Sequence, residues 1–92
     1  MPTLVEVKDE VEVKGPDQTD ERKLVVFNDS VNTFDNVINA LVEICKHSSQ
    51  QAEQSALIIH TKGKYAVKTG TNEILLPMQI GLIDRGIEAE VQ

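Results

Sequence analysis

Hydrophobic and polar residues fall into blocks of different spacing along the chain. A short apolar run, Leu24 to Phe27, is closed by the turn-forming residues Asn28-Asp29-Ser30 and predicts a buried strand over residues 23–27. Apolar residues then recur every three or four positions, which predicts an amphipathic helix with one face in a core. This helical set consists of Phe34, Val37, Ile38, Leu41, Val42 and Cys45. Asn32 or Thr33 is placed to cap the helix.

A second helix is predicted to begin after Ser48. Ser48 is followed three residues later by Gln51, which is the pattern of a capping box. The buried side of this helix would carry Ala52, Ala56 and Ile59, and His60 would lie one turn after Ala56. Gly63 is a suitable residue for the end of the helix, because glycine adopts the left-handed conformation there at little cost.

The last third of the chain predicts a strand, a helix and a strand. Residues 64–68 form the second short strand, and Thr71 can cap a third helix that reaches about Arg85. Pro77 leaves two possibilities for this helix, because proline inside a helix costs about 3 kcal/mol. Either a separate first turn precedes a main helix that begins at Pro77, or one helix kinks there. Residues 87–91 alternate as a third strand.

The order β-α-α-β-α-β predicts an α+β fold, with three helices packed on a three-stranded antiparallel sheet. We expect residues 23–92 to form this one domain and residues 1–22 to form a disordered acidic extension. Residues 1–21 hold seven acidic residues and two lysines, which is most of the net charge of −6. High charge with weak hydrophobicity favours disorder. The alternating Val-Glu-Val-Lys segments, however, leave open an additional edge strand formed in a crystal or with a partner.

Several classes of function lack their sequence signals. No basic stripe is present to bind phosphates, so nucleic acid is not expected as a partner. No apolar run of about 18 residues predicts a membrane span, and no secretory leader is visible. The single cysteine, Cys45, fits a reducing cytoplasm and is expected to be a core residue. No metal, cofactor or phosphate-loop motif occurs, and no base–nucleophile pair indicates an enzyme.

The corner after the first strand and the end of the second helix together resemble a known family. The strand ends in Asn28-Asp29, an amphipathic helix follows, and the second helix carries His60 shortly before Gly63 and a short strand. This arrangement is similar to the ClpS family, the adaptors that recognise N-terminal degradation signals for Clp unfoldase–protease machines. The resemblance runs from Lys23 to Thr69 without gaps and continues more weakly through the Thr-x-Glu of the third helix.

The resemblance implies a non-enzymatic adaptor that delivers substrates to a Clp ATP-dependent unfoldase–protease. Asn28, Asp29 and His60 would bind the free α-amino group of a substrate protein with a destabilising N-terminal residue. An apolar pocket beside them would take the first side chain. By position its lining would be Asn32, Phe34, Val37, Ala56, Ile59 and Ile87. The N-terminal extension would be engaged by the unfoldase, and Glu73 would dock on the N-terminal domain of this Clp-type AAA+ partner.

The chain departs from the family at three informative positions. Ser30 stands where the family has a second Asp, Met78 replaces a Lys of the docking face, and Ala56 replaces a Met that narrows the pocket. The alternative function is a protein-interaction module of the same fold that does not recognise an N-terminal amine. A related fold, the C-terminal domain of the ribosomal stalk protein, lacks the Asn-Asp and His pocket, so the fold alone does not decide between the two.

Overall fold

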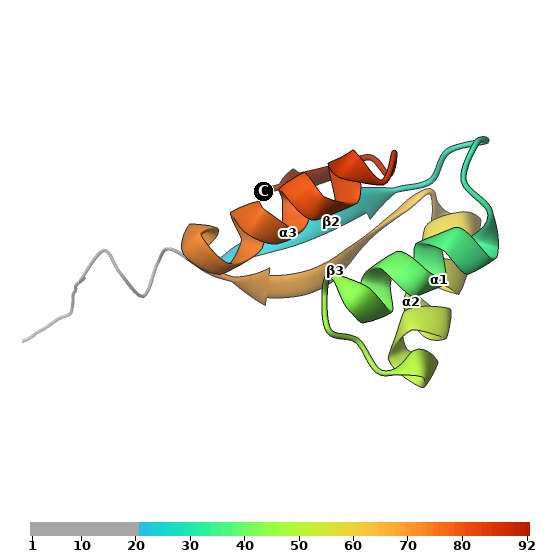
Figure 1. Cartoon of the computed structure of the whole chain (residues 1–92), viewed down its shortest axis with the longest axis horizontal. Helices are drawn as coiled ribbons and strands as arrows, with labels where there is room; N and C mark the ends of the chain where they lie inside the picture. The colour runs from blue at the N-terminus through green and yellow to red at the C-terminus, as the bar shows by residue number, and fades with distance from the viewer. Residues whose placement is uncertain (1–20) are drawn as a thin grey trace, which may run out of the picture.

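The computed structural model describes residues 21–92 and confirms the predicted order of elements (Figure 1). The predicted disorder of the N-terminal extension concerns residues that lie almost entirely outside this range. The elements are β2 (Arg22–Phe27), α1 (Phe34–Glu43), α2 (Ser49–Lys62), β3 (Lys64–Gly70), α3 (Asn72–Asp84) and β4 (Ala89–Val91). No helix among the described residues is long and apolar enough to cross a membrane.

The described strands form one antiparallel sheet in the order β3-β2-β4. The central strand β2 pairs with β3 from Arg22 opposite Gly70 to Phe27 opposite Lys64, with an irregularity between Leu24 and Val25. On its other side β2 pairs with β4, which places Val26 opposite Ala89. The strand β2, the first of the predicted domain, is therefore the central strand, and both β3 and β4 pair with it.

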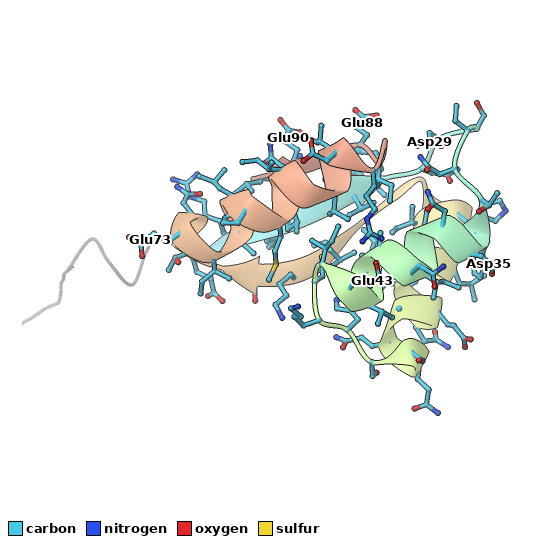
Figure 2. All side chains as sticks on the ribbon, viewed as in Figure 1. Asp29, Asp35, Glu43, Glu73, Glu88 and Glu90 are labelled. Atoms are coloured by element: carbon cyan, nitrogen blue, oxygen red, sulfur yellow. The ribbon has the colours of Figure 1, made fainter. Side chains whose placement is uncertain are left out.

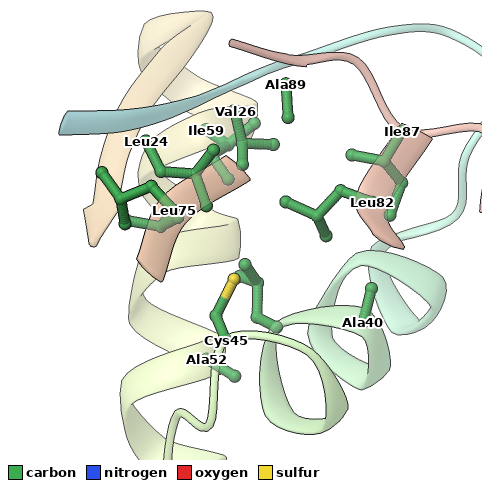
Figure 3. Packing of buried hydrophobic residues seen from close by; sticks show 12 residues of the cluster. Leu24, Val26, Ala40, Cys45, Ala52, Ile59, Leu75, Leu82, Ile87 and Ala89 are labelled. Atoms are coloured by element: carbon green, nitrogen blue, oxygen red, sulfur yellow. The ribbon is translucent and has the colours of Figure 1, made fainter. Parts of the chain in front are cut away.

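The core lies between the sheet and the helices. Leu24 and Val26 are two positions apart on β2, so they share one face of the sheet, and both are fully buried. The same cluster takes Leu41 from α1, Ile59 from α2 and Leu82 from α3, together with smaller residues (Figure 3). All three helices therefore cover one face of the sheet, as an α+β arrangement requires.

The helix ends follow the capping residues of the sequence. Thr33 caps α1 by accepting a hydrogen bond from Asn36 N, and Ser48 caps α2 by accepting one from Gln51 N. Gly63 ends α2 with φ of 93°, a left-handed conformation that a side chain would strain. This sharp stop lets β3 begin at the next residue.

The third helix continues through Pro77 from Asn72 to Asp84. A separate first turn ending before Pro77 is therefore excluded. The proline lies on the exposed side of α3, while Leu75 and Leu82 anchor the helix in the core. Their burial offsets the lost backbone hydrogen bond, which is why tertiary packing overrides the local preference.

Three strand boundaries differ from the sequence prediction. Arg22 belongs to β2, so the strand begins within the predicted extension. The next strand is longer than residues 64–68 and continues to Gly70, which pairs with Arg22. The last strand is shorter than residues 87–91 and covers only Ala89–Val91, because Ile87 is turned into the core and donates its backbone N–H to Leu82 O. The α3–β4 turn therefore occupies the positions where the alternating pattern begins.

Candidate functional site

The end of β2 lies beside the end of α2. Phe27 pairs with Lys64, and the next residue, Asn28, donates its backbone N–H to Gly63 O at 2.9 Å. Because Gly63 immediately follows α2, this bond holds the Asn28–Asp29 corner against the helix turn that carries His60. Residues about thirty positions apart in the chain are thus brought to one edge of the fold.

A cavity of about 480 Å³ opens at this edge. Its size lies within the range of small-ligand pockets. One side is polar and the other apolar, and the apolar floor includes Ala56 and Ile59, which are each 2% exposed. The full lining consists of Asn28, Asp29, Ser30, Asn32, Thr33, Phe34, Val37, Ala56, Ile59 and His60.

The Asp29 carboxylate organises the loop between β2 and α1. Its Oδ1 accepts hydrogen bonds from Val31 N at 2.9 Å and Asn32 N at 2.8 Å. Its Oδ2 accepts one from Asn32 Nδ2 at 2.9 Å. A carboxylate has about four acceptor positions, so one remains without a partner among residues 21–92. Figure 2 shows Asp29 in this loop, at the end of the molecule that holds the cavity.

The hydrogen bonds to Asp29 also lower the pKa of its carboxyl group. The largest cause is the backbone N–H of Asn32, followed by the side-chain amide of the same residue. Partial burial opposes these bonds, and the Val31 N–H adds a smaller lowering. Asp29 is therefore a carboxylate at neutral pH and brings a negative charge to the cavity.

Asn28 and His60 add two further polar groups to the cavity wall. Both are exposed, and neither side chain hydrogen-bonds to another described residue. Asn28 offers an amide oxygen, and a neutral imidazole offers one ring nitrogen as an acceptor. The cavity thus combines one negative charge, an amide and an imidazole with an apolar floor.

The cavity contains eight of the nine residues that the sequence assigned to the amine site and side-chain pocket. The ninth, Ile87, is not among the lining residues. It is 2% exposed and lies in the core near Leu82 (Figure 3). Glu73 lies in the first turn of α3, at the opposite end of the molecule from Asp29 (Figure 2).

Three polar residues of this region have no role in the sequence prediction of the site. Ser30 and Thr33 line the cavity, and Asn36 donates from its side-chain Nδ2 to Asn32 Oδ1. The position of Thr33 near the cavity could have been predicted, because it is the N-cap residue of α1 and therefore lies at the end of the loop. Asn36 is partly buried and carries no such signal, because the first turn of a helix accepts many polar residues.

Other chemically reactive side chains lie away from the cavity in the core. Cys45 is fully buried, and burial raises the pKa of its thiol to about 11, against a smaller lowering by Lys68. His47 is 5% exposed, and its Nε2 lies 2.9 Å from Val67 O. Within residues 21–92, no three His, Cys, Asp or Glu side chains are grouped to hold a metal ion. The cavity is therefore the candidate site.

The amino-acid sequence matches a known protein family. Residues 17–83 match the family described as ATP-dependent Clp protease adaptor protein ClpS. The chain belongs to the ClpS family. This match covers more than half of the chain and includes every residue that lines the cavity.

Curated relatives support the assignment. An ATP-dependent Clp protease adapter protein ClpS of Campylobacter jejuni subsp. jejuni strain 81-176 is 37% identical over 62 residues. Its counterpart in Campylobacter jejuni subsp. doylei has the same identity, and that of strain RM1221 is 36% identical. The matched segment covers 67% of this chain and 65% of each of these ClpS relatives, slightly less than two thirds of their length.

The lowered pKa of Asp29 predicts a pH-dependent contribution to stability. A carboxyl group whose pKa is depressed in the folded state stabilises the fold above its unfolded value, close to 3.8. That contribution is lost as the pH falls through the folded pKa. We expect Asp29→Asn to lower the free energy of unfolding at pH 7, with a difference from the parent that shrinks towards pH 3.

Urea unfolding of both proteins across this pH range measures the effect. The exposed carboxylate Glu53 on α2 offers a control, Glu53→Gln, for the loss of one surface charge. A difference between parent and Asp29→Asn that is constant from pH 7 to pH 3 would contradict the role of the Asp29 charge in the loop.

Proposed function

We propose that this ClpS family member binds the free N-terminal residue of substrate proteins and delivers them to a Clp ATP-dependent unfoldase–protease. The observation that carries the proposal is the grouping of Asn28, Asp29 and His60 at one cavity whose floor is apolar. The protein acts as an adaptor and not as an enzyme, in keeping with the description of its family, and we propose the cytoplasm as its location.

The chemistry of an N-terminal residue matches both parts of the cavity. An α-ammonium group carries one positive charge and three N–H donors. The Asp29 carboxylate pairs with the charge, while Asn28 Oδ1 and a ring nitrogen of His60 accept the remaining hydrogen bonds. The first side chain enters the apolar part, where Phe34, Val37, Ala56 and Ile59 replace its contact with water.

Helix α3 provides a surface for the unfoldase. Glu73 lies in the first turn of α3, and four apolar residues of the same helix are about half exposed: Ile74 at 51%, Leu76 at 44%, Ile80 at 58% and Ile83 at 49%. A spacing of four and three residues places Leu76, Ile80 and Ile83 on one side of the helix. An exposed apolar stripe beside an acidic residue suits a protein partner, the unfoldase N-terminal domain. Glu73 itself lies at the other end of the molecule from Asp29 (Figure 2).

The amine site predicts a dependence on the free terminus. A peptide that begins with Leu or Phe should bind the parent protein, and its N-acetylated twin should lose most of the affinity because it lacks the charge. Asp29→Asn should weaken the free-amine peptide by about 1.5–3 kcal/mol, or roughly ten- to a hundredfold in Kd. Fluorescence anisotropy with labelled peptides measures these constants.

A matched control is Asp35→Asn, which removes a carboxylate from the first turn of α1 outside the cavity lining. It should bind both peptides as the parent does. Because Asp29 also orders its loop, an amide NMR spectrum of Asp29→Asn must show that the fold is intact. Equal binding of the free and acetylated peptides by the parent would refute amine recognition and favour the interaction-module alternative.

The cavity floor predicts a broad preference for the first side chain. Ala56 lies one turn before His60 and is a short residue where the family carries Met. Ala56→Met would narrow the pocket, and we expect peptides that begin with Ile or Trp to lose more affinity than one that begins with Leu. Discrimination by fit amounts to about 1–3 kcal/mol per methylene. Equal losses for Phe, Leu, Trp and Ile peptides, or none, would show that Ala56 does not select the side chain.

The extension before β2 is proposed to be the segment that the unfoldase engages during delivery. The described domain begins beside the first turn of α3, since Arg22 pairs with Gly70 and Thr71 caps that helix. Deleting residues 2–20 should leave the melting temperature and peptide affinity nearly unchanged while abolishing degradation by the Clp protease. A large fall in melting temperature would show that the extension belongs to the fold.

A further inference from the structure

We propose that Asn32 is the positioning residue of the amine site, where it orients the Asp29 carboxylate and fastens the pocket loop to the α3–β4 turn. The resemblance suggested another role, as one wall of the pocket for the first side chain. The inference concerns the loop itself, and only its effect on peptide affinity rests on the proposed function.

The side chain of Asn32 makes three hydrogen bonds. Its Nδ2 donates to Asp29 Oδ2 at 2.9 Å and to the backbone carbonyl Gly86 O at 2.7 Å. Its Oδ1 accepts from Asn36 Nδ2. A side-chain NH₂ group has two hydrogens, so both donors are used. The amide has no donor left for a ligand, and its two acceptor neighbours fix which end of the amide points towards Asp29.

The loop from Asn28 to Thr33 is held to two other parts of the domain by hydrogen bonds. Its first residue is fixed by the backbone bond from Asn28 N to Gly63 O. The two bonds to Asp29 Oδ1 stay inside the loop and do not attach it to the rest of the domain. The bond from Asn32 to Gly86 spans 54 positions in the chain and supplies the second anchor, on the far side of the corner.

The side-chain amide of Asn32 also orients the Asp29 carboxylate. Two backbone N–H groups hold Oδ1, and Asn32 Nδ2 holds Oδ2. Hydrogen bonds on both oxygens restrain rotation of the carboxylate, so the remaining acceptor position on Oδ2 keeps a preferred direction. An ammonium group is then met by an acceptor that is already oriented, which avoids an ordering cost on binding. The lowered pKa of Asp29, to which the Asn32 side chain contributes, agrees with this contact.

A titration of the parent protein without peptide tests the contact directly. The side-chain NH₂ signals of Asn32 and the carboxyl carbon of Asp29 are followed by NMR as the pH falls. We expect the Asn32 signals to move with the pKa of Asp29, because protonation weakens the hydrogen bond between them. Asn32 signals that do not respond to the titration of Asp29 would overturn the proposal.

A substitution tests the consequence. Asn32→Leu keeps the size of the side chain and removes the three hydrogen bonds. It should raise the pKa of Asp29 towards its ordinary value and weaken a free-amine Leu peptide about tenfold. The control is Asn36→Ala, which removes the donor to Asn32 Oδ1 but leaves Asp29 and Gly86 in contact with Asn32. It should change the affinity by less than about twofold.

The outcomes separate this inference from the proposed function. An Asn32→Leu protein that folds and keeps both the pKa of Asp29 and the peptide affinity would refute positioning by Asn32. If the pKa rises while free and acetylated peptides bind the parent equally, Asn32 positions Asp29 but the amine site is wrong. If Asn32→Leu does not fold, the titration of the parent protein decides.

Discussion

The pairing of β2 with β3 is the constraint on which the candidate site depends. It ends with Phe27 opposite Lys64 and is extended by the bond from Asn28 N to Gly63 O. Since α2 stops at a left-handed glycine and β3 starts at once, the last turn of α2 must lie beside the end of β2. A longer α2–β3 connection would remove this constraint and let His60 move away from the Asn28–Asp29 corner.

The cavity is built on the same packing that stabilises the domain. Ile59 belongs both to the hydrophobic core and to the cavity floor, and Ala56 beside it is almost fully buried. The floor is therefore part of the packed core. The polar side comes from a loop, which has no core of its own and is held by hydrogen bonds. The polar side chains of this loop therefore contribute to the site in two ways: they line the cavity, and their hydrogen bonds hold the loop in place.

Two parts of the domain surface carry different chemistry. The cavity gathers acceptors around an apolar floor, and α3 presents Glu73 in its first turn and an apolar stripe along the helix. The core lies between the helices and the sheet. In the proposed function these two surfaces allow one small domain to hold a substrate terminus and a protein partner at the same time.

The sequence by itself determined the order of elements, the helix caps and the acceptors at the corner. These features depend on short-range patterns: apolar spacing, Thr33 and Ser48 before helices, Gly63 after one, and turn residues after a buried run. The resemblance to an adaptor family placed His60 with the corner, because it relates residues that local patterns cannot connect. Eight of the nine assigned residues then share one cavity.

Only the tertiary structure decided where Ile87 and Asn32 act and how α3 passes Pro77. Alternation placed Ile87 in a strand, but the α3–β4 turn directs it into the core. Asn32 meets Gly86 only because the chain folds back over 54 positions, and no spacing near Asn32 predicts a carbonyl acceptor there. Burial of Leu75 and Leu82 keeps α3 continuous through Pro77 against its local preference. In each case a contact distant in sequence outweighs the pattern around the residue.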